Sequence, residues 1–211
     1  MENETSTQES AATLFVVDDD GAVVSAIQGV ARLLGVRMDA YRSADEFLTS
    51  YDPERPGCLL MDYKLPGMSG LELLQKLRTF DDSLPVVMIS GHANVKTAVR
   101  AMQAGAITLL EKPVELDELC YAIQSAMAVD RMRRQKAVEQ QEAKNLVDSL
   151  TAKERQVFDF VVEGKTNKEI AKTLAVSVRA VEDRRARMMT KLGADYLSDL
   201  IEMHAKMRSR D

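Results

Sequence analysis

Cysteine is scarce in this sequence. Only two cysteines occur among the 211 residues, Cys58 and Cys120, and both lie in apolar stretches. They are far apart, form no CxxC pair and have no histidine cluster nearby, so neither a disulfide framework nor a metal motif is indicated. We therefore expect two buried, reduced thiols in a cytosolic protein.

Long apolar runs and targeting signals are also missing. No run of about 18 apolar residues occurs, which excludes an ordinary transmembrane helix. The first ten residues, from Met1 to Ser10, are polar and acidic and lack the basic and apolar regions of a signal peptide. We expect a disordered tail over residues 1–11 and a soluble, cytoplasmic protein without a membrane partner.

Charge is unevenly distributed along the chain. Residues 1–129 hold 10 Lys and Arg against 19 Asp and Glu, a net charge of −9, whereas residues 130–211 hold 18 against 14, a net charge of +4. This split suggests an acidic module joined to one that binds a polyanion. The second half is only mildly basic, so charge alone does not establish DNA binding.

Short apolar runs alternate with helical periodicity five times over residues 12–128. The runs predict strands over residues 13–17, 37–41, 58–62, 85–90 and 107–111. The periodic segments predict helices over residues 22–34, 43–50, 69–79, 95–104 and 116–127. Because parallel neighbours need crossover connections, this alternation predicts an α/β domain with a doubly wound, five-stranded parallel sheet.

The rest of the chain has a different pattern. Residues 129–148 are polar and contain neither Pro nor Gly, which predicts a helical linker that extends the fifth helix. Within residues 149–211, capping boxes and glycine stops predict four short helices over residues 151–163, 166–174, 178–192 and 196–207. A tight turn between the second and third predicts an all-α helix-turn-helix domain.

Polar side chains follow four of the predicted strands. Asp18 and Asp19, then Asp62, Ser90 and Lys112, each come directly after or at the end of an apolar run. The carboxyl ends of parallel strands border one crevice, so we expect these groups to converge. Clustered carboxylates repel one another, and an oxygen-only cluster suits Mg²⁺. A carboxylate held beside Mg²⁺ can become an aspartyl phosphate, and Asp62 is the candidate.

Each of these residues also has an ordinary structural interpretation. The acids from Asp18 to Asp20 suit a helix N-terminus, where Asp20 is the expected cap, Ser90 suits a turn, and Lys112 suits a solvated strand end. Taken one at a time, these interpretations are the better ones. Their joint occurrence at successive strand ends favours a phosphoacceptor pocket.

At these positions the chain resembles the receiver domain of two-component response regulators, over about residues 12–128. The matching motifs, in order, are Val17-Asp18-Asp19, Asp62 with the run from Leu65 to Gly70, Ser90-Gly91, Gly105-Ala106 and Lys112-Pro113. The resemblance implies the flavodoxin-like fold of CheY. It also implies phosphoryl transfer to Asp62 from a phosphohistidine on a sensor histidine kinase.

The resemblance implies roles for the pocket residues. Asp19 and Asp62 would bind Mg²⁺ directly, the Lys64 backbone carbonyl would be a third ligand, and Asp18 would act through a water molecule. Ser90 and Lys112 would contact the phosphoryl oxygens.

A switch is implied as well. Receivers usually carry an aromatic residue three positions before the lysine, where this chain has Leu109. We expect phosphorylation to repack Ser90, Leu109 and the face formed by the fourth helix, the fifth strand and the fifth helix. This repacking would bias the protein toward a homodimer.

The second half resembles the LuxR/NarL-type output domain of the FixJ family, over about residues 149–204. The matching segments are 150–155, 164–171, Val181-Glu182 and 191–193. The resemblance implies a four-helix unit whose third helix enters the major groove of double-stranded DNA and whose fourth helix can dimerise. In the third helix the family usually has Thr-Val-(Lys or Glu)-hydrophobic-His-Arg. This chain has Ala-Val-Glu-Asp-Arg-Arg there, at residues 180–185.

Helical spacing divides the third helix of this domain. Val181, Met188, Met189 and Leu192 form the expected core face, which leaves the other side for DNA. Arg179 suits guanine, and Glu182 or Asp183 suits cytosine. The expected DNA contacts are Lys165, Thr166, Asn167, Lys168, Ser177, Arg179, Glu182, Asp183, Arg185, Ala186, Arg187 and Lys191.

The resulting hypothesis is a DNA-binding transcriptional regulator controlled by phosphorylation of Asp62, and no enzyme beyond its own phosphorylation and dephosphorylation. One rival is a phosphatase that works through an aspartyl phosphate, but such an enzyme needs a second acid where this chain has Lys64. The other rival is a phosphorylation-independent DNA-binding or protein-docking regulator with a vestigial receiver.

Overall fold

The computed structural model describes residues 12–208, and the tail predicted over residues 1–11 lies outside them. The chain forms two compact units, and the boundary between them falls between Arg133 and Arg134. The strands of the first unit are β1 (Thr13–Val17), β2 (Arg37–Tyr41), β3 (Gly57–Asp62), β4 (Val86–Ser90) and β5 (Thr108–Glu111). Its helices are α1 (Gly21–Leu34), α2 (Ala44–Ser50), α3 (Gly70–Leu77), α4 (Val95–Gln103) and the first part of α5 (Leu116–Asp148).

The strands form one sheet in the order β2-β1-β3-β4-β5, and every pairing is parallel. This order is that of the flavodoxin-like sheet, in which β1 and β3 flank the point where the winding direction changes. The predicted doubly wound fold is confirmed. Its strand boundaries agree closely with the apolar runs, and β3 begins one residue earlier than predicted, at Gly57.

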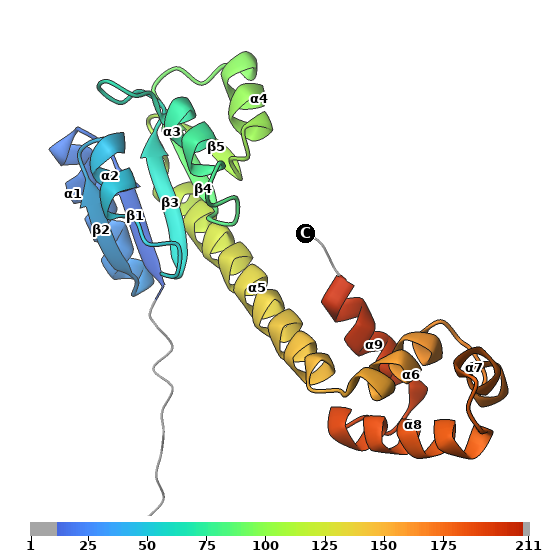
Figure 1. The fold of residues 1–211 in the computed structure, drawn as a ribbon. Coiled ribbons are helices and arrows are strands. Elements are labelled where there is room, and N and C mark those ends of the chain that lie inside the picture. The colour runs from blue at the N-terminus through green and yellow to red at the C-terminus, as the bar shows by residue number, and fades with distance from the viewer. Residues whose placement is uncertain (1–11, 209–211) are drawn as a thin grey trace, which may run out of the picture. The chain divides into compact units, whose positions relative to one another are not determined.

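Both faces of the sheet are covered by helices (Figure 1). Alternate residues of a strand point to opposite faces, so Phe15 and Met88 pack with α2, α3 and α4. Leu14 and Leu60 pack on the other face with α1 and α5. A sheet buried on both faces needs continuous apolar strands, which explains the unbroken Leu59-Leu60-Met61 run before Asp62.

Helix α5 is unbroken from Leu116 to Asp148, so the predicted extension past residue 129 is helical. Before it leaves the first unit, it is tied to the sheet at two points. The buried Asp130 carboxylate accepts the backbone N–H of Gly57 at 2.9 Å, at the start of β3. Arg133 donates to the Ser83 carbonyl at 2.6 Å, just before β4. Both contacts lie at the sheet edge opposite to Asp62.

The second unit comprises the end of α5 and helices α6 (Ala152–Val162), α7 (Asn167–Leu174), α8 (Val178–Leu192) and α9 (Leu197–Arg208). They surround one apolar core, to which Phe158 of α6, Ile170 of α7 and Val181 of α8 contribute. The turn between α7 and α8 begins at Ala175, which adopts the left-handed conformation with φ of 52°. The predicted helix-turn-helix arrangement is confirmed.

Side-chain caps explain where these helices begin. Capping boxes are present at Ser69, Thr151 and Thr166, each three residues before a glutamate. Ser43 and Glu46 have the same spacing but form only half of a box, because the Glu46 carboxylate accepts the N–H of Arg42 rather than that of Ser43. Among the described residues, no helix is both long and apolar enough to cross a membrane.

We predict that Gly57→Ala severely destabilises the first unit. Gly57 has φ of 157°, and a Cβ there would lie 1.9 Å from the Thr13 carbonyl oxygen. Strain and overlap together should cost at least ~3 kcal/mol in the free energy of unfolding, measured by denaturant titration.

The matched control is Gly29→Ala in α1, where an added Cβ meets no atom within 4 Å. That change should stabilise the protein by about 0.5–1 kcal/mol through helix propensity and reduced freedom of the unfolded chain. Equal unfolding midpoints for the two variants would contradict the prediction.

Candidate functional site

Strand register places two carboxylates side by side at the carboxyl edge of the sheet. Val17 of β1 lies opposite Met61 of β3, so the residues that follow them, Asp18 and Asp62, are neighbours. Asp18 is almost fully buried, at 2% exposure. The Asp62 side chain is 13% exposed and can still be reached from solvent.

The next two strands bring Ser90 and Lys112 to the same edge. Ile89 lies opposite Asp62, so Ser90 ends β4 one residue further on. The backbone N–H of Lys112 donates to the Ser90 carbonyl at 2.9 Å, which fixes the chain where β5 ends. A cis peptide bond joins Lys112 to Pro113 at this point.

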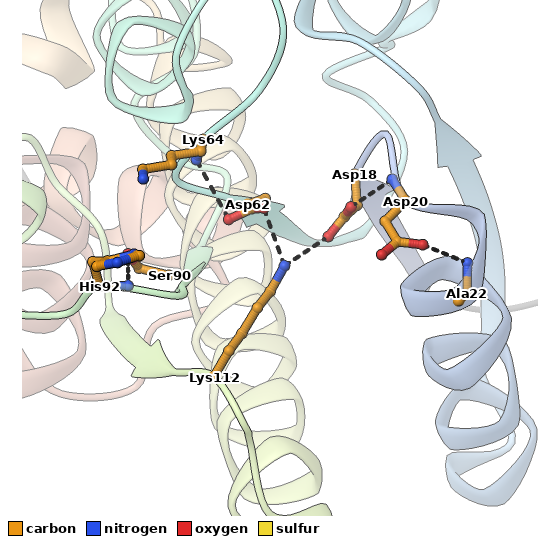
Figure 2. Close-up of polar contacts among 8 residues, drawn as sticks. All are labelled: Asp18, Asp20, Ala22, Asp62, Lys64, Ser90, His92 and Lys112. Carbon is orange, nitrogen blue, oxygen red and sulfur yellow. Dashed lines mark hydrogen bonds and ion pairs between the residues drawn. The ribbon is translucent and has the colours of Figure 1, made fainter.

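The Lys112 ammonium lies between the two carboxylates (Figure 2). Its Nζ is 3.0 Å from Asp62 Oδ2 and 3.4 Å from Asp18 Oδ2. One positive charge therefore serves two negative ones, and the three side chains together carry a net charge of −1 when all are ionised. This imbalance leaves the pocket favourable to a further cation.

Two pKa shifts describe the electrostatics of the pocket. Burial raises the pKa of Asp18, and the charge of Asp62 acts in the same direction, although the Asp20 N–H and Lys112 oppose both. Burial alone would lower the pKa of Lys112, but its bonds to Asp62 and Asp18 outweigh burial and raise it. Lys112 thus stays charged, whereas ionised Asp18 is held at a cost.

Gly70 has a structural role beside Asp62 that the sequence alone did not reveal. A Cβ at Gly70 would lie 2.3 Å from the backbone oxygen of Asp62, so only glycine allows α3 to begin this close to the strand end. Its N–H donates to the Tyr63 carbonyl at 3.0 Å. Gly70 belongs to the motif after Asp62, but its spacing alone does not reveal the close approach.

In the second unit, burial along α8 follows the predicted division. Val181, Met188 and Leu192 are buried, and Met189 is half-buried. The predicted base contacts on the opposite side are exposed, namely Arg179, Glu182, Asp183, Ala186 and Arg187. The helix therefore offers one polar face and one apolar face.

Some of the predicted DNA contacts already have partners within the second unit. Arg185 donates to the Asn167 side chain at 3.1 Å, which joins α8 to the start of α7. Lys191 donates to Glu154 at 2.7 Å, which joins the last turn of α8 to α6. Lys165, Thr166, Lys168 and Ser177 lie near the starts of α7 and α8.

Comparison with known proteins identifies both units. Residues 14–124 match the family described as response regulator receiver domain, and residues 148–204 match bacterial regulatory proteins, luxR family. The chain is similar to the response regulator protein TodT of Pseudomonas putida, with 32% identity over 200 residues, 95% of this chain and 88% of TodT. The chain belongs to the response regulators of the FixJ/NarL type.

Solved structures agree with this assignment. The response regulator StyR is similar to this regulator with a TM-score of 0.82 and 37% identity, covering 93% of this chain and 99% of StyR. Full-length FixJ from B. japonicum is similar with a TM-score of 0.58 and 32% identity, covering 95% and 98% of the two chains. The regulator thus combines a receiver with a LuxR-type DNA-binding domain, and phosphorylation-dependent regulation is typical of its family.

The donors at the regulator's pocket suit Mg²⁺. Within residues 12–208 no three His, Cys, Asp or Glu side chains are grouped to hold a metal ion. Mg²⁺ needs fewer protein ligands, because it binds through one or two carboxylates and keeps several waters. Asp18 and Asp62 both contact the Lys112 ammonium. Asp19 is the next residue after Asp18 and is exposed. The Lys64 N–H is 3.4 Å from Asp62 Oδ1.

The predicted switch residues share one face of the regulator's sheet. Ser90 is buried, and its hydroxyl accepts the N–H of His92 at 3.2 Å. Leu109 lies on β5 opposite Met88 and packs, half-buried, into the core that Ala101 of α4 joins. Leu109 thus packs in the same core as Ala101 of α4.

We predict that Asp18→Asn raises the melting temperature of the regulator at neutral pH. Since the pKa of Asp18 is raised, its stabilising contribution is full below the ordinary value of 3.8 and is lost as pH rises through the folded value. The variant removes the charge and the penalty together. Its advantage should shrink as pH falls through the folded pKa of Asp18, measured by calorimetry across pH.

Asp20→Asn is the matched control, because Asp20 is exposed and caps α1 through a bond to the Ala22 N–H at 2.8 Å. Asparagine caps helices as well as aspartate does, so this variant should have the same melting temperature as the wild type. A loss of stability in Asp18→Asn at neutral pH would show that ionised Asp18 is favourable in the fold.

Proposed function

We propose that the regulator accepts a phosphoryl group on Asp62 from a phosphohistidine of a sensor histidine kinase, and that this changes its dimerisation and DNA binding. The supporting observation is the Lys112 ammonium held 3.0 Å from the partly exposed Asp62 carboxylate. A lysine so placed can neutralise an oxygen of an incoming phosphoryl group without leaving its strand end.

The reaction is a displacement at phosphorus. A carboxylate oxygen of Asp62 forms a bond to phosphorus while the bond from phosphorus to the imidazole nitrogen breaks and the imidazole takes the electron pair. Lys112 and the Ser90 hydroxyl contact phosphoryl oxygens, where charge accumulates in the transition state. The half-buried pocket strengthens these contacts by limiting water.

The proposal includes Mg²⁺ at the same edge. Asp19 and Asp62 would hold the ion directly, with the Lys64 carbonyl as third ligand and Asp18 acting through water. When bound, the ion supplies positive charge that neutralises phosphoryl oxygens. The chain's own contribution is the buried Asp18 charge, whose cost a second cation would relieve.

A second copy of the regulator is the proposed partner of the receiver. Helix α4 leaves three apolar side chains exposed at helical spacing, with Val95 82%, Val99 47% and Met102 49% exposed. Because Leu109 packs in the core that Ala101 of α4 joins, repacking of Leu109 on phosphorylation would change how these three side chains are exposed. Burying it in a homodimer would favour the phosphorylated state.

DNA is the proposed partner of the second unit. The exposed side of α8 would enter the major groove, with Arg179 on guanine and Glu182 or Asp183 on cytosine, while Ala186 and Arg187 lie on the same side. Residues near the starts of α7 and α8 would contact phosphates, namely Lys165, Thr166, Asn167, Lys168, Ser177 and Arg185. Lys191 differs from these residues because it donates to the buried Glu154 carboxylate.

We predict that incubation with acetyl phosphate and Mg²⁺ adds about 80 Da to the intact protein, one phosphoryl group in place of a proton. Asp62→Asn should gain no mass, because an amide oxygen is a poor nucleophile. Asp82→Asn, which removes an exposed acid after α3, is the control and should gain the full mass. Unmodified wild type would favour a vestigial receiver.

We also predict that Val99→Asp abolishes phosphorylation-dependent dimerisation, because a charge would replace a buried apolar contact at the proposed interface. Light scattering with beryllofluoride and Mg²⁺ measures the mass, and phosphoryl uptake should be unchanged. Leu33→Asp, at a 66% exposed position on α1, is the control and should dimerise normally. A normal dimer of Val99→Asp would place the interface elsewhere.

A further inference from the structure

Glu154 is a buried acid in a domain otherwise rich in exposed charge. Although it occupies the first turn of α6, only 4% of the residue is exposed. Its carboxylate accepts the N–H of Thr151 at 2.9 Å, as expected for a capping box, and also accepts the Lys191 ammonium at 2.7 Å. Cap and ion pair thus meet on one side chain.

These contacts favour the ionised form of the Glu154 carboxyl group. The Lys191 hydrogen bond, followed by the bonds from Thr151, lowers the pKa of Glu154 to about 2. Glu154 therefore stays ionised at any ordinary pH. Arg187 is a weaker neighbour, with Nε 4.0 Å from Glu154 Oε1 and a 66% exposed side chain, so it remains available to DNA.

We propose that Glu154 is a positioning residue for DNA binding, and that Lys191 acts through Glu154 inside the domain instead of contacting a DNA phosphate. This inference rests on the proposed DNA contacts of α8. The apolar contacts of Met188 and Leu192 hold α8 on the core, but such contacts are not directional. A short, charge-assisted hydrogen bond at the last turn is directional, and it fixes the orientation of the base-facing side.

The two possible roles of Lys191 predict opposite effects of Glu154→Gln. If Lys191 contacted a phosphate, removing Glu154 would release it, and DNA affinity and its salt dependence would both rise. Each phosphate contact contributes about 0.9 to the slope of log affinity against log salt concentration. If Lys191 positions α8, Glu154→Gln and Lys191→Met should both weaken binding, leave the slope unchanged, and have no larger effect together than singly.

The experiment uses the full chain activated with beryllofluoride and Mg²⁺, and two labelled duplexes, one selected by the activated wild type from a randomised pool and one of randomised sequence. Fluorescence anisotropy over a range of salt concentrations gives affinities and slopes. On the selected duplex we expect about a fivefold to tenfold loss for each variant and for the double variant. The randomised duplex should be bound almost as before, because misplaced base contacts matter only where sequence is discriminated.

Lys168→Met is the reference for a phosphate contact, since Lys168 is exposed in the first turn of α7. It should weaken binding to both duplexes alike and reduce the salt slope by about 0.9. Hydrogen exchange of α8 in the full chain provides a readout without DNA. Exchange in its last turns should accelerate equally in Glu154→Gln, Lys191→Met and the double variant.

The outcomes separate this inference from the proposed function. Tighter binding by Glu154→Gln, a lower salt slope for Lys191→Met, or additive exchange effects would each overturn the positioning role while leaving DNA binding intact. A wild-type chain that selected no sequence would overturn the proposed function, and the inference with it.

Discussion

The receiver pocket depends on one ammonium group, that of Lys112, which two carboxylates share. Asp18 and Asp62 stand at the ends of neighbouring parallel strands, so their carboxylates lie close together. Lys112 Nζ lies within 3.4 Å of an oxygen of each. Without it, the two carboxylates in a half-buried pocket would repel each other with no opposing charge. The lysine offsets only part of this cost, because the pKa of Asp18 is still raised. The ionised form of Asp18 therefore remains unfavourable in the pocket, and a further cation would relieve this cost.

Both units use a buried acid bound to a lysine from a distant element, but with opposite electrostatic results. In the receiver, one ammonium is paired with two carboxylates. The remaining negative charge favours the binding of a further cation. In the DNA-binding domain, the Glu154 carboxylate accepts hydrogen bonds from Lys191 and from the Thr151 N–H of the helix cap. These bonds lower its pKa to about 2. The first arrangement can respond to a ligand. The second is already satisfied and serves to hold α8.

Much of this architecture could be predicted because its determinants are local. Apolar runs and helical periodicity located the strands and helices, and parallel pairing required their polar ends to meet at one edge. Membership of the pocket followed from Asp18, Asp62, Ser90 and Lys112 each standing at a strand end. Capping boxes followed from serine or threonine three residues before glutamate, and only the box at Ser43 differed, because Glu46 bonds to Arg42.

The sequence by itself therefore determined the order of elements, the fold class and the approach of Asp18, Asp62 and Lys112 to one another. Only the tertiary structure decided which polar groups pair across long stretches of chain. Asp130 binds Gly57 across 73 positions, and Lys191 binds Glu154 across 37. Periodicity repeats over a few residues and carries no information about such distances. Charge alone cannot distinguish a lysine that faces DNA from one that faces a buried acid, because both occupy the exposed side of a helix until neighbouring helices pack against it.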